Sequence, residues 1–280
     1  MDFLTGWDFE REEADLKALM DYQEYCGEQF LLQWSDVRER IYEEAKLRTE
    51  WSIVHPLCNY TVAQTKTNGC VSYGVSAAVE DRLCLALQQR KEVEVFRSCA
   101  PWLYGGYHNI INGRPGSGGC SMAGMMRFIA QYGILPYDTQ PKIYADGEVD
   151  WNRNARSWKQ VFEKWGGEAE KFQIKVAKLP RNFNDIVACL QAGYAVPYGT
   201  DKKSYLDKKT GYYVLSGRTM HCMSWSGFGG GFTYNKNSWL DGRGKQRLED
   251  VRTQVNSNYF DCFVVLDIER TRKGKPDYGL

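Results

Sequence analysis

Residues 219–229, with the sequence TMHCMSWSGFG, run through a glycine-rich turn into the segment NKNSW at residues 235–239. The first segment predicts a β-strand that begins at a histidine, and the glycines at 229–231 favour a hairpin turn. Such a hairpin places Asn237 beside His221. There the amide oxygen of Asn237 can accept the imidazole N–H and fix the tautomer of the ring. The two strands therefore present an oriented histidine, which is what a general base requires.

Cys70 begins an apolar-periodic stretch that runs to about Arg90, and this pattern predicts a long buried helix. A thiol at the first turn of a helix faces unpaired N–H groups and the positive end of the helix dipole. Both features lower its pKa and favour the nucleophilic thiolate. Gln64 lies on the entering loop, where its amide could join a backbone N–H in stabilising an oxyanion. A buried core cysteine at a helix start explains Cys70 better when this residue is taken alone.

The remaining pattern predicts an α+β protein in which helices precede strands. Asp8 to Glu50 is helical and charged, Gly105 to Gly119 is expected to be loop, and Ser121 is a candidate N-cap for a further helix. The predicted strands are Lys171–Val176, Tyr194–Tyr198, His221–Phe228, Gly231–Asn235 and Phe260–Leu266. This order indicates two lobes.

Composition excludes several classes of protein. Of 280 residues 36 are basic and 35 acidic, so the net charge of +1 argues against a nucleic-acid-binding chain. No apolar run approaches the roughly 18 residues that span a bilayer, and the N-terminus lacks the features of a secretory signal. The nine cysteines are scattered without a CxxC pair, which argues against a zinc site and a disulfide scaffold. We therefore expect a cytoplasmic or otherwise reducing location, with no membrane and no nucleic-acid partner.

Negative charge is concentrated at the N-terminus. Residues 2–50 hold 14 acidic against 6 basic side chains. A solvated helical face explains this excess, and so does an extension that docks on a basic body or on a partner protein.

The motifs, in this order and spacing, resemble those of papain-like cysteine peptidases. The matching positions are Gln64 and Cys70, then Ser117-Gly118-Gly119, then His221, then Asn237-Ser238-Trp239. The resemblance covers residues 56–268. It implies an α+β, papain-like fold with a helical lobe at about 56–160 and a β-barrel-like lobe at about 161–268.

The resemblance also assigns roles to the residues. It implies that Cys70 is the nucleophile, His221 the general base and acid, and Asn237 the residue that orients the ring. Gln64 would donate to the oxyanion. The substrate would be a peptide or protein, and neither a metal nor a cofactor is implied.

The same resemblance implies a substrate-binding surface. Gly118 and Gly119 would offer their backbone to an extended peptide. Cys120 and Cys222 would line an apolar pocket for the residue second before the scissile bond. Trp239 would shield the hydrogen bond between Asn237 and His221 from water.

The chain departs from the family pattern in two places. The family's Cys-Gly-Ser-Cys-Trp reads Thr67-Asn68-Gly69-Cys70-Val71 here, and the usual disulfide partner of the first cysteine falls on Gly116. Both halves of that bridge are absent, as in a compact, disulfide-free form that resembles bacterial and phage members. Residues 1–55 occupy the place of the inhibitory prosegment without its helix signature, so they are either a prosegment or a permanent arm for assembly. Residues 269–280 form a basic tail.

Three functions follow from these observations. The first is a cysteine peptidase that cleaves peptide bonds through a thioester intermediate. The second is a non-catalytic structural protein that keeps the fold, for example in a virus particle. The third is a hydrolase of cell-wall amides.

Overall fold

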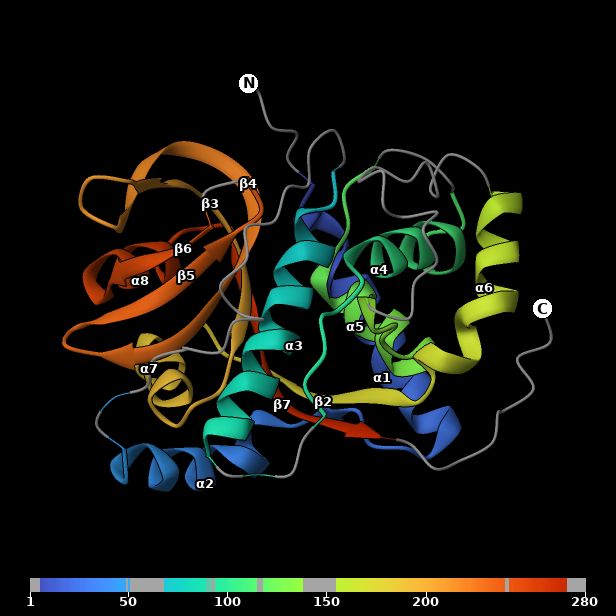
Figure 1. Ribbon diagram of the computed structural model, residues 1–280, viewed down its shortest axis with the longest axis horizontal. Coiled ribbons are helices and arrows are strands. Elements are labelled where there is room, and N and C mark those ends of the chain that lie inside the picture. The colour runs from blue at the N-terminus through green and yellow to red at the C-terminus, as the bar shows by residue number, and fades with distance from the viewer. Residues whose placement is uncertain are drawn as a thin grey trace.

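The computed structural model describes residues 6–48, 50, 68–89, 91, 94–114, 118–137, 155–239 and 242–270. The protein has a helical half and a strand-rich half, with helix α3 between them (Figure 1). The helices are α1 (Glu12–Cys26), α2 (Trp34–Lys46), α3 (Cys70–Gln88), α4 (Ala100–Gly106), α5 (Met122–Tyr132), α6 (Ala155–Ala169), α7 (Phe183–Gln191) and α8 (Leu248–Val255), with the short turns η1 (Phe9–Arg11) and η3 (Tyr107–Ile111). The strands are β1 (Leu31–Leu32), β2 (Phe172–Lys178), β3 (Val196–Asp207), β4 (Tyr212–Gly229), β5 (Phe232–Asn237), β6 (Gly242–Arg247) and β7 (Phe260–Arg270). The fold is therefore α+β, as predicted.

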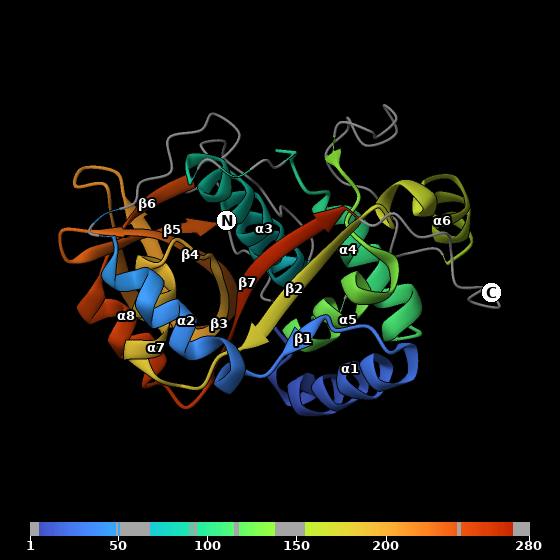
Figure 2. The same ribbon diagram turned by 90° about the horizontal axis from the view of Figure 1, so that it is seen from below.

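One sheet runs through both halves of the described chain. Its order is β1-β2-β7-β3-β4-β5-β6, with β1 parallel to β2 and antiparallel pairing between all the other neighbours. Figure 2 shows β2 and β7 side by side and antiparallel, connecting the strand-rich half with the helical half. The sheet is open, with β1 and β6 at the ends of its strand order, so the strand-rich lobe is not a closed barrel. Strand β6 also pairs with the start of β4, at Tyr212 and Lys245.

Helix α3 is buried on almost every side because it packs against helices of one half and strands of the other. Its acidic residues are buried as well, and each forms an ion pair with the strand-rich half. Glu80 pairs with Lys236 of β5, and Asp81 pairs with Arg243 of β6. These buried pairs fix α3, and with it Cys70 at its first residue, relative to the strands.

The N-terminal extension is an integral part of this fold. Helix α2 packs against α7 and buries Ile41 in the core of the strand-rich half (Figure 2). Asp185, buried on α7, accepts hydrogen bonds from the side chains of Trp34, Arg38 and Tyr42. Strand β1 adds an edge to the sheet, and α1 packs against α5. Removal of the whole extension would therefore expose core residues of both halves.

This packing predicts a large stability effect at α2. Replacing the fully buried Ile41 by alanine is expected to lower the free energy of unfolding by about 2–4 kcal/mol, because it removes buried methyl groups and leaves a cavity. Leu47→Ala is the matched control, since that side chain is 84% exposed, and it should change the same quantity by less than about 0.5 kcal/mol. Urea denaturation measures both. Equal effects of the two substitutions would mean that α2 does not belong to the core.

Several sequence expectations are confirmed locally. Helix α3 begins at Cys70, and the Ser121 side chain accepts the Gly124 N–H as the N-cap of α5. Gly230 and Gly231 both have positive φ in the two-residue turn that joins β4 to β5.

The prediction of a loop from Gly105 to Gly119 is wrong in its first part. Residues up to 111 continue as α4 and the π-helical turn η3. Glycine is needed at position 106 for packing, since a Cβ there would lie 1.9 Å from the Phe128 ring of α5. A glycine that permits close helix packing looks the same in the sequence as one that marks a loop.

The expectation of a disulfide-free chain is also wrong at one position. Cys84 on α3 takes part in a disulfide whose other half lies outside the described residues. The other described cysteines are free thiols, and all of these except Cys26 are buried.

None of the helices in the described part of the chain is long and apolar enough to cross a membrane.

Candidate functional site

The β4–β5 hairpin brings His221 and Asn237 together. Its register pairs Ser224 with Lys236, which sets His221 diagonally across from Asn237. His221 Nε2 lies 2.7 Å from Asn237 Oδ1, so the amide oxygen accepts the imidazole N–H. The indole of Trp239 stacks on the imidazole with 3.9 Å between ring centroids. All three side chains are buried.

Cys70 occupies the first position of α3 and is fully buried. Backbone N–H groups of Cys222, Gly6 and Val71 lie against its sulfur. Cys222 directly follows His221 in β4, so the thiol is next to the histidine strand. Among the hydrogen bonds of the described residues there is none between the Cys70 thiol and the His221 ring, and His221 Nδ1 has no partner there. Nδ1, the ring nitrogen that Asn237 does not use, is therefore available to accept a proton from a thiol.

The prediction of a lowered pKa and a thiolate at Cys70 is wrong for this conformation. Burial raises its pKa to about 12, although the surrounding backbone N–H groups lower it. Burial also lowers the pKa of His221 to about 4, although its bond to Asn237 raises it. Near pH 7 the site thus holds a neutral thiol and a neutral imidazole, because water has no access to either group.

This pair of pKa shifts predicts how Cys70 reacts with iodoacetamide in the intact chain. Below pH 12 the thiolate is a minor species, and His221 is already neutral above pH 4. The alkylation rate of Cys70 should therefore rise about tenfold per pH unit from pH 6 to 10, without a plateau. Cys26, which is partly exposed, serves as the internal reference for accessibility. Mass spectrometry of tryptic peptides measures both rates, and a plateau for Cys70 between pH 5 and 8 would reveal a thiolate–imidazolium pair instead.

Residues 6–10, here called the leading segment, lie against this site. Gly6 O accepts the Cys120 N–H at 2.7 Å, and the Asp8 N–H donates to Cys120 O at 2.9 Å. Trp7 therefore lies opposite Cys120 in a parallel bridge. The fit is tight, since a Cβ on Gly119 would lie 2.9 Å from Gly6 O. Cys120, which follows the two glycines, thus pairs through its backbone with an extended segment of the same chain.

Two acidic side chains of α1 bind the start of α5, and one of them, Glu12, also holds the leading segment. Glu12 accepts hydrogen bonds from the Trp7 indole at 2.8 Å and from the first two backbone N–H groups of α5, those of Met122 and Ala123. Asp15 accepts from the N-cap hydroxyl of α5 at Ser121. Burial raises the pKa of Glu12 to about 7, against the lowering effect of its N–H donors. Helix α1 therefore docks on the positive end of α5.

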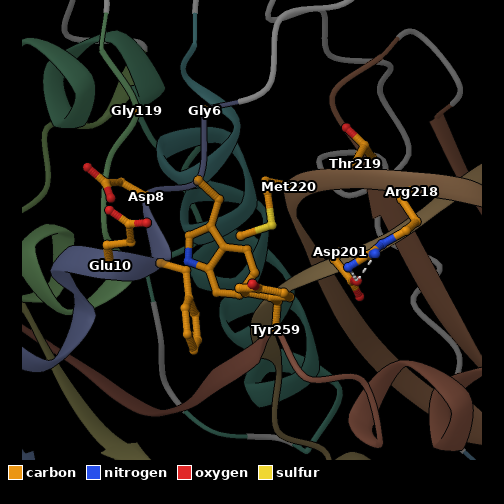
Figure 3. A pocket seen from close by; sticks show the side chains of 11 residues that line it. Gly6, Asp8, Glu10, Gly119, Asp201, Arg218, Thr219, Met220 and Tyr259 are labelled. Atoms are coloured by element: carbon orange, nitrogen blue, oxygen red, sulfur yellow. Dashed lines mark hydrogen bonds and ion pairs between the residues drawn. The ribbon is translucent and has the colours of Figure 1, made fainter.

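A cavity of about 610 Å³ opens beside the leading segment. Figure 3 shows Asp8 and Glu10 on one side of it and the ion pair of Asp201 with Arg218 on the other, with Met220 between the two sides. Arg218 and Met220 come from β4, just before His221. The cavity is therefore continuous with the histidine strand.

The structure brings most of the predicted residues together. Cys70, His221, Asn237, Trp239, Gly118, Gly119, Cys120 and Cys222 lie in this region, while Gln64 and Ser117 fall outside the described residues. Cys120 has a contact that was not predicted, since its sulfur lies 3.6 Å from Nε2 of the buried His108.

Sequence reasoning missed Trp7 and Glu12. The spacing of Trp7 and Phe9, two residues apart just before an acidic helix, is the one signal of an extended segment there. In the described part of the chain, no group of three or more histidine, cysteine or acidic side chains could hold a metal ion.

No protein-family model and no curated protein sequence matches this chain. Solved structures do match it. Xylellain, a cysteine protease from Xylella fastidiosa, is 13% identical with a TM-score of 0.54, covering 81% of this chain and 93% of its own. Digestive procathepsin L 3 from the larval midgut of Tenebrio molitor is 16% identical with a TM-score of 0.51, covering 92% and 90%. A cysteine protease of Carica candamarcensis is 14% identical with a TM-score of 0.53, covering 80% and 99%. The chain therefore has the papain-like peptidase fold.

Proposed function

We propose that the protein is a cysteine peptidase with Cys70 as nucleophile and His221 as general base and acid. The observation that carries the proposal is the 2.7 Å bond between Asn237 Oδ1 and His221 Nε2, which leaves Nδ1 of the ring without a partner among the described residues. The residue after His221, Cys222, contacts the Cys70 thiol through its backbone N–H. The papain-like fold, which the matching structures share over 80–92% of this chain, supports the same proposal.

In the proposed reaction, His221 takes the Cys70 proton and the sulfur attacks the carbonyl carbon of a peptide bond. Backbone N–H groups at the start of α3, with Gln64 as the proposed side-chain donor, stabilise the oxyanion. The C–N bond then breaks, and the leaving amine takes the proton from His221. Water, deprotonated by His221, hydrolyses the thioester and restores the thiol. Asn237 keeps the ring in the tautomer that both steps need.

We further propose that the described conformation is latent. The leading segment occupies the backbone groups of Cys120 and excludes water from Cys70, which keeps the thiol neutral. The procathepsin covers 92% of this chain, against 80% and 81% for the other two neighbours, and this supports a prosegment-like position for part of the extension. Because α2 is built into the core, latency ends when residues 6–10 are displaced, without loss of the whole extension.

Covalent trapping tests the nucleophile. The full chain carrying Trp7→Ala, which loosens the leading segment, is incubated with a peptidyl epoxide and digested for mass spectrometry. We expect the adduct on Cys70 and none on Cys189 or Cys262, which are equally buried but lie in the core of the strand-rich half. His221→Ala should abolish the adduct without changing the thermal unfolding midpoint by more than a few degrees.

An adduct that follows exposure alone, on Cys26 first and never on Cys70, would refute the peptidase proposal. The alternative is then a non-catalytic protein that keeps the fold. Trapping on Cys70 together with cleavage of peptidoglycan but not of peptides would instead favour the cell-wall hydrolase.

A further inference from the structure

Tyr104 lies between two backbone segments of the candidate site. It belongs to α4, which packs against both α3 and α5, and its side chain is buried. Its hydroxyl donates a hydrogen bond to Gly118 O at 3.1 Å. The same hydroxyl accepts the backbone N–H of Asn68, two residues before Cys70. One oxygen atom therefore joins residues 118–120, here called the glycine segment, to residues 68–69, here called the nucleophile turn.

His108 supports the Tyr104 ring and contacts the same glycine segment. The two residues are four positions apart, so they share one face of the helical stretch that runs from α4 into η3. The buried imidazole meets the Tyr104 ring edge to face with 4.6 Å between centroids. Its Nε2 lies 3.6 Å from the Cys120 sulfur, and the ring also contacts the Gly118 backbone. This face of the helix therefore holds the glycine segment at both of its ends.

The leading segment lies across both of the segments that Tyr104 joins. Gly6 O accepts the Cys120 N–H, and a Cβ on Gly6 would lie 1.6 Å from Asn68 O. The Gly6 N–H faces the Cys70 sulfur. An extended peptide in this position is thus held by the glycine segment while it lies against the nucleophile turn. The spacing between the two segments determines where such a peptide meets the sulfur.

A small change in this spacing has a large effect on the proposed reaction. Attack on a carbonyl needs reacting atoms about 3–3.5 Å apart, and a misplacement of about 1 Å can lower the rate by about 100-fold. Without the Tyr104 hydroxyl, the Gly118 carbonyl and the Asn68 N–H both lose a buried partner. Buried polar groups that lose a partner move toward another one, because leaving them unbonded is costly. Loss of the hydroxyl therefore changes the spacing.

We propose that Tyr104 is a positioning residue whose hydroxyl sets the spacing between the glycine segment and the nucleophile turn, so that a bound peptide carbonyl meets the Cys70 sulfur. This inference rests on the proposed peptidase function for its effect on hydrolysis. The hydroxyl is bonded to backbone groups and exchanges no proton in the reaction. Its loss should therefore lower kcat, while KM and the reactivity of the thiol toward a small reagent stay nearly unchanged.

Tyr104→Phe tests the inference, because it removes only the hydroxyl. In the chain opened by Trp7→Ala, we expect kcat on a fluorogenic peptide to fall about 10- to 100-fold and KM to change by less than about threefold. Alkylation of Cys70 by iodoacetamide needs no bound peptide, so its rate should stay within about twofold. Tyr213→Phe is the matched control, since the buried Tyr213 hydroxyl also donates to a glycine carbonyl, Gly242 O, at 2.8 Å. It should leave kcat unchanged.

A second measurement needs no hydrolysis and uses the chain with its leading segment intact. Amide hydrogen exchange at Cys120, whose N–H bonds to Gly6 O, is followed by nuclear magnetic resonance on protein isotopically labelled at cysteine. Tyr104→Phe should accelerate this exchange by about tenfold or more, because the leading segment then docks on two segments that no longer match its shape. The amide of Cys189, on α7, is the internal reference and should exchange at an unchanged rate. Tyr213→Phe should alter the Cys120 exchange rate little.

The two measurements separate the two proposals. A fall in kcat without a change in KM or in alkylation supports the positioning role. Faster exchange at Cys120 with no hydrolysis by any of the chains supports the positioning role and refutes the peptidase. Unchanged kcat and unchanged exchange overturn the positioning role and leave the peptidase standing. A fall in kcat that Tyr213→Phe reproduces, or that alkylation follows equally, means that Tyr104 only stabilises the fold, and this also overturns the inference. No hydrolysis together with unchanged exchange overturns both.

Discussion

Replacing Cys70 by serine is expected to lower kcat/KM for peptide hydrolysis by at least about 10³-fold in the chain opened by Trp7→Ala. A serine hydroxyl is a far weaker acid than a thiol, and the proposed mechanism offers only the His221 imidazole as its base. Such a base removes a thiol proton far more readily than a hydroxyl proton. Initial rates on a fluorogenic peptide, normalised to folded protein, measure the effect.

Cys189→Ser and Cys262→Ser are the matched controls for this substitution. Both thiols are as fully buried as that of Cys70, but they lie in the core of the strand-rich half. They should cost stability through a buried hydroxyl and leave kcat/KM within about twofold. Should Cys70→Ser behave like these two, the thiol is a core side chain and the proposed mechanism fails.

The sequence predicts two parts of the site, the His221–Asn237 pair and the position of Cys70 at the start of a helix, because each depends only on residues near it in the sequence. A two-residue glycine turn fixes the register of β4 and β5, and that register brings Asn237 to His221. The start of α3 follows from the apolar run after Gly69, and it puts Cys70 at a helix N-terminus. In both cases the relevant residues are close in sequence or lie on one element.

The protonation state of the Cys70 thiol could not be predicted, because it depends on a contact between residues more than a hundred positions apart in the sequence. Trp7 meets Cys120 and Gly199, and nothing in the local pattern of residues 6–10 indicates either partner. In the latent state that we propose, this contact excludes water from Cys70. Burial raises the pKa of its thiol, which the helix terminus alone would lower. The sign of a pKa shift depends on access to water, which is a property of the whole fold.

Trp7→Ala is expected to raise the rate at which the full chain hydrolyses peptides by about 10²-fold or more. The indole is buried against Gly199 and donates to Glu12, so truncation to alanine should cost the docked segment about 3–5 kcal/mol. Each 1.4 kcal/mol shifts the ratio of displaced to docked segment tenfold. The rate should rise by the same factor for as long as the docked form predominates, and a fluorogenic peptide assay on purified full-length protein measures it.

Tyr25→Ala provides the comparison for Trp7→Ala, because Tyr25 is an aromatic residue of the same extension that is 89% exposed. It should leave the hydrolysis rate unchanged. The opened chain should also lose the steep pH dependence of Cys70 alkylation, since water then reaches the sulfur and its pKa falls toward the ordinary value for cysteine. Equal rates and equal alkylation profiles for Trp7→Ala and the unaltered chain would show that residues 6–10 do not control the site. A higher hydrolysis rate with an unchanged alkylation profile would instead mean that the segment blocks peptides without sealing the thiol.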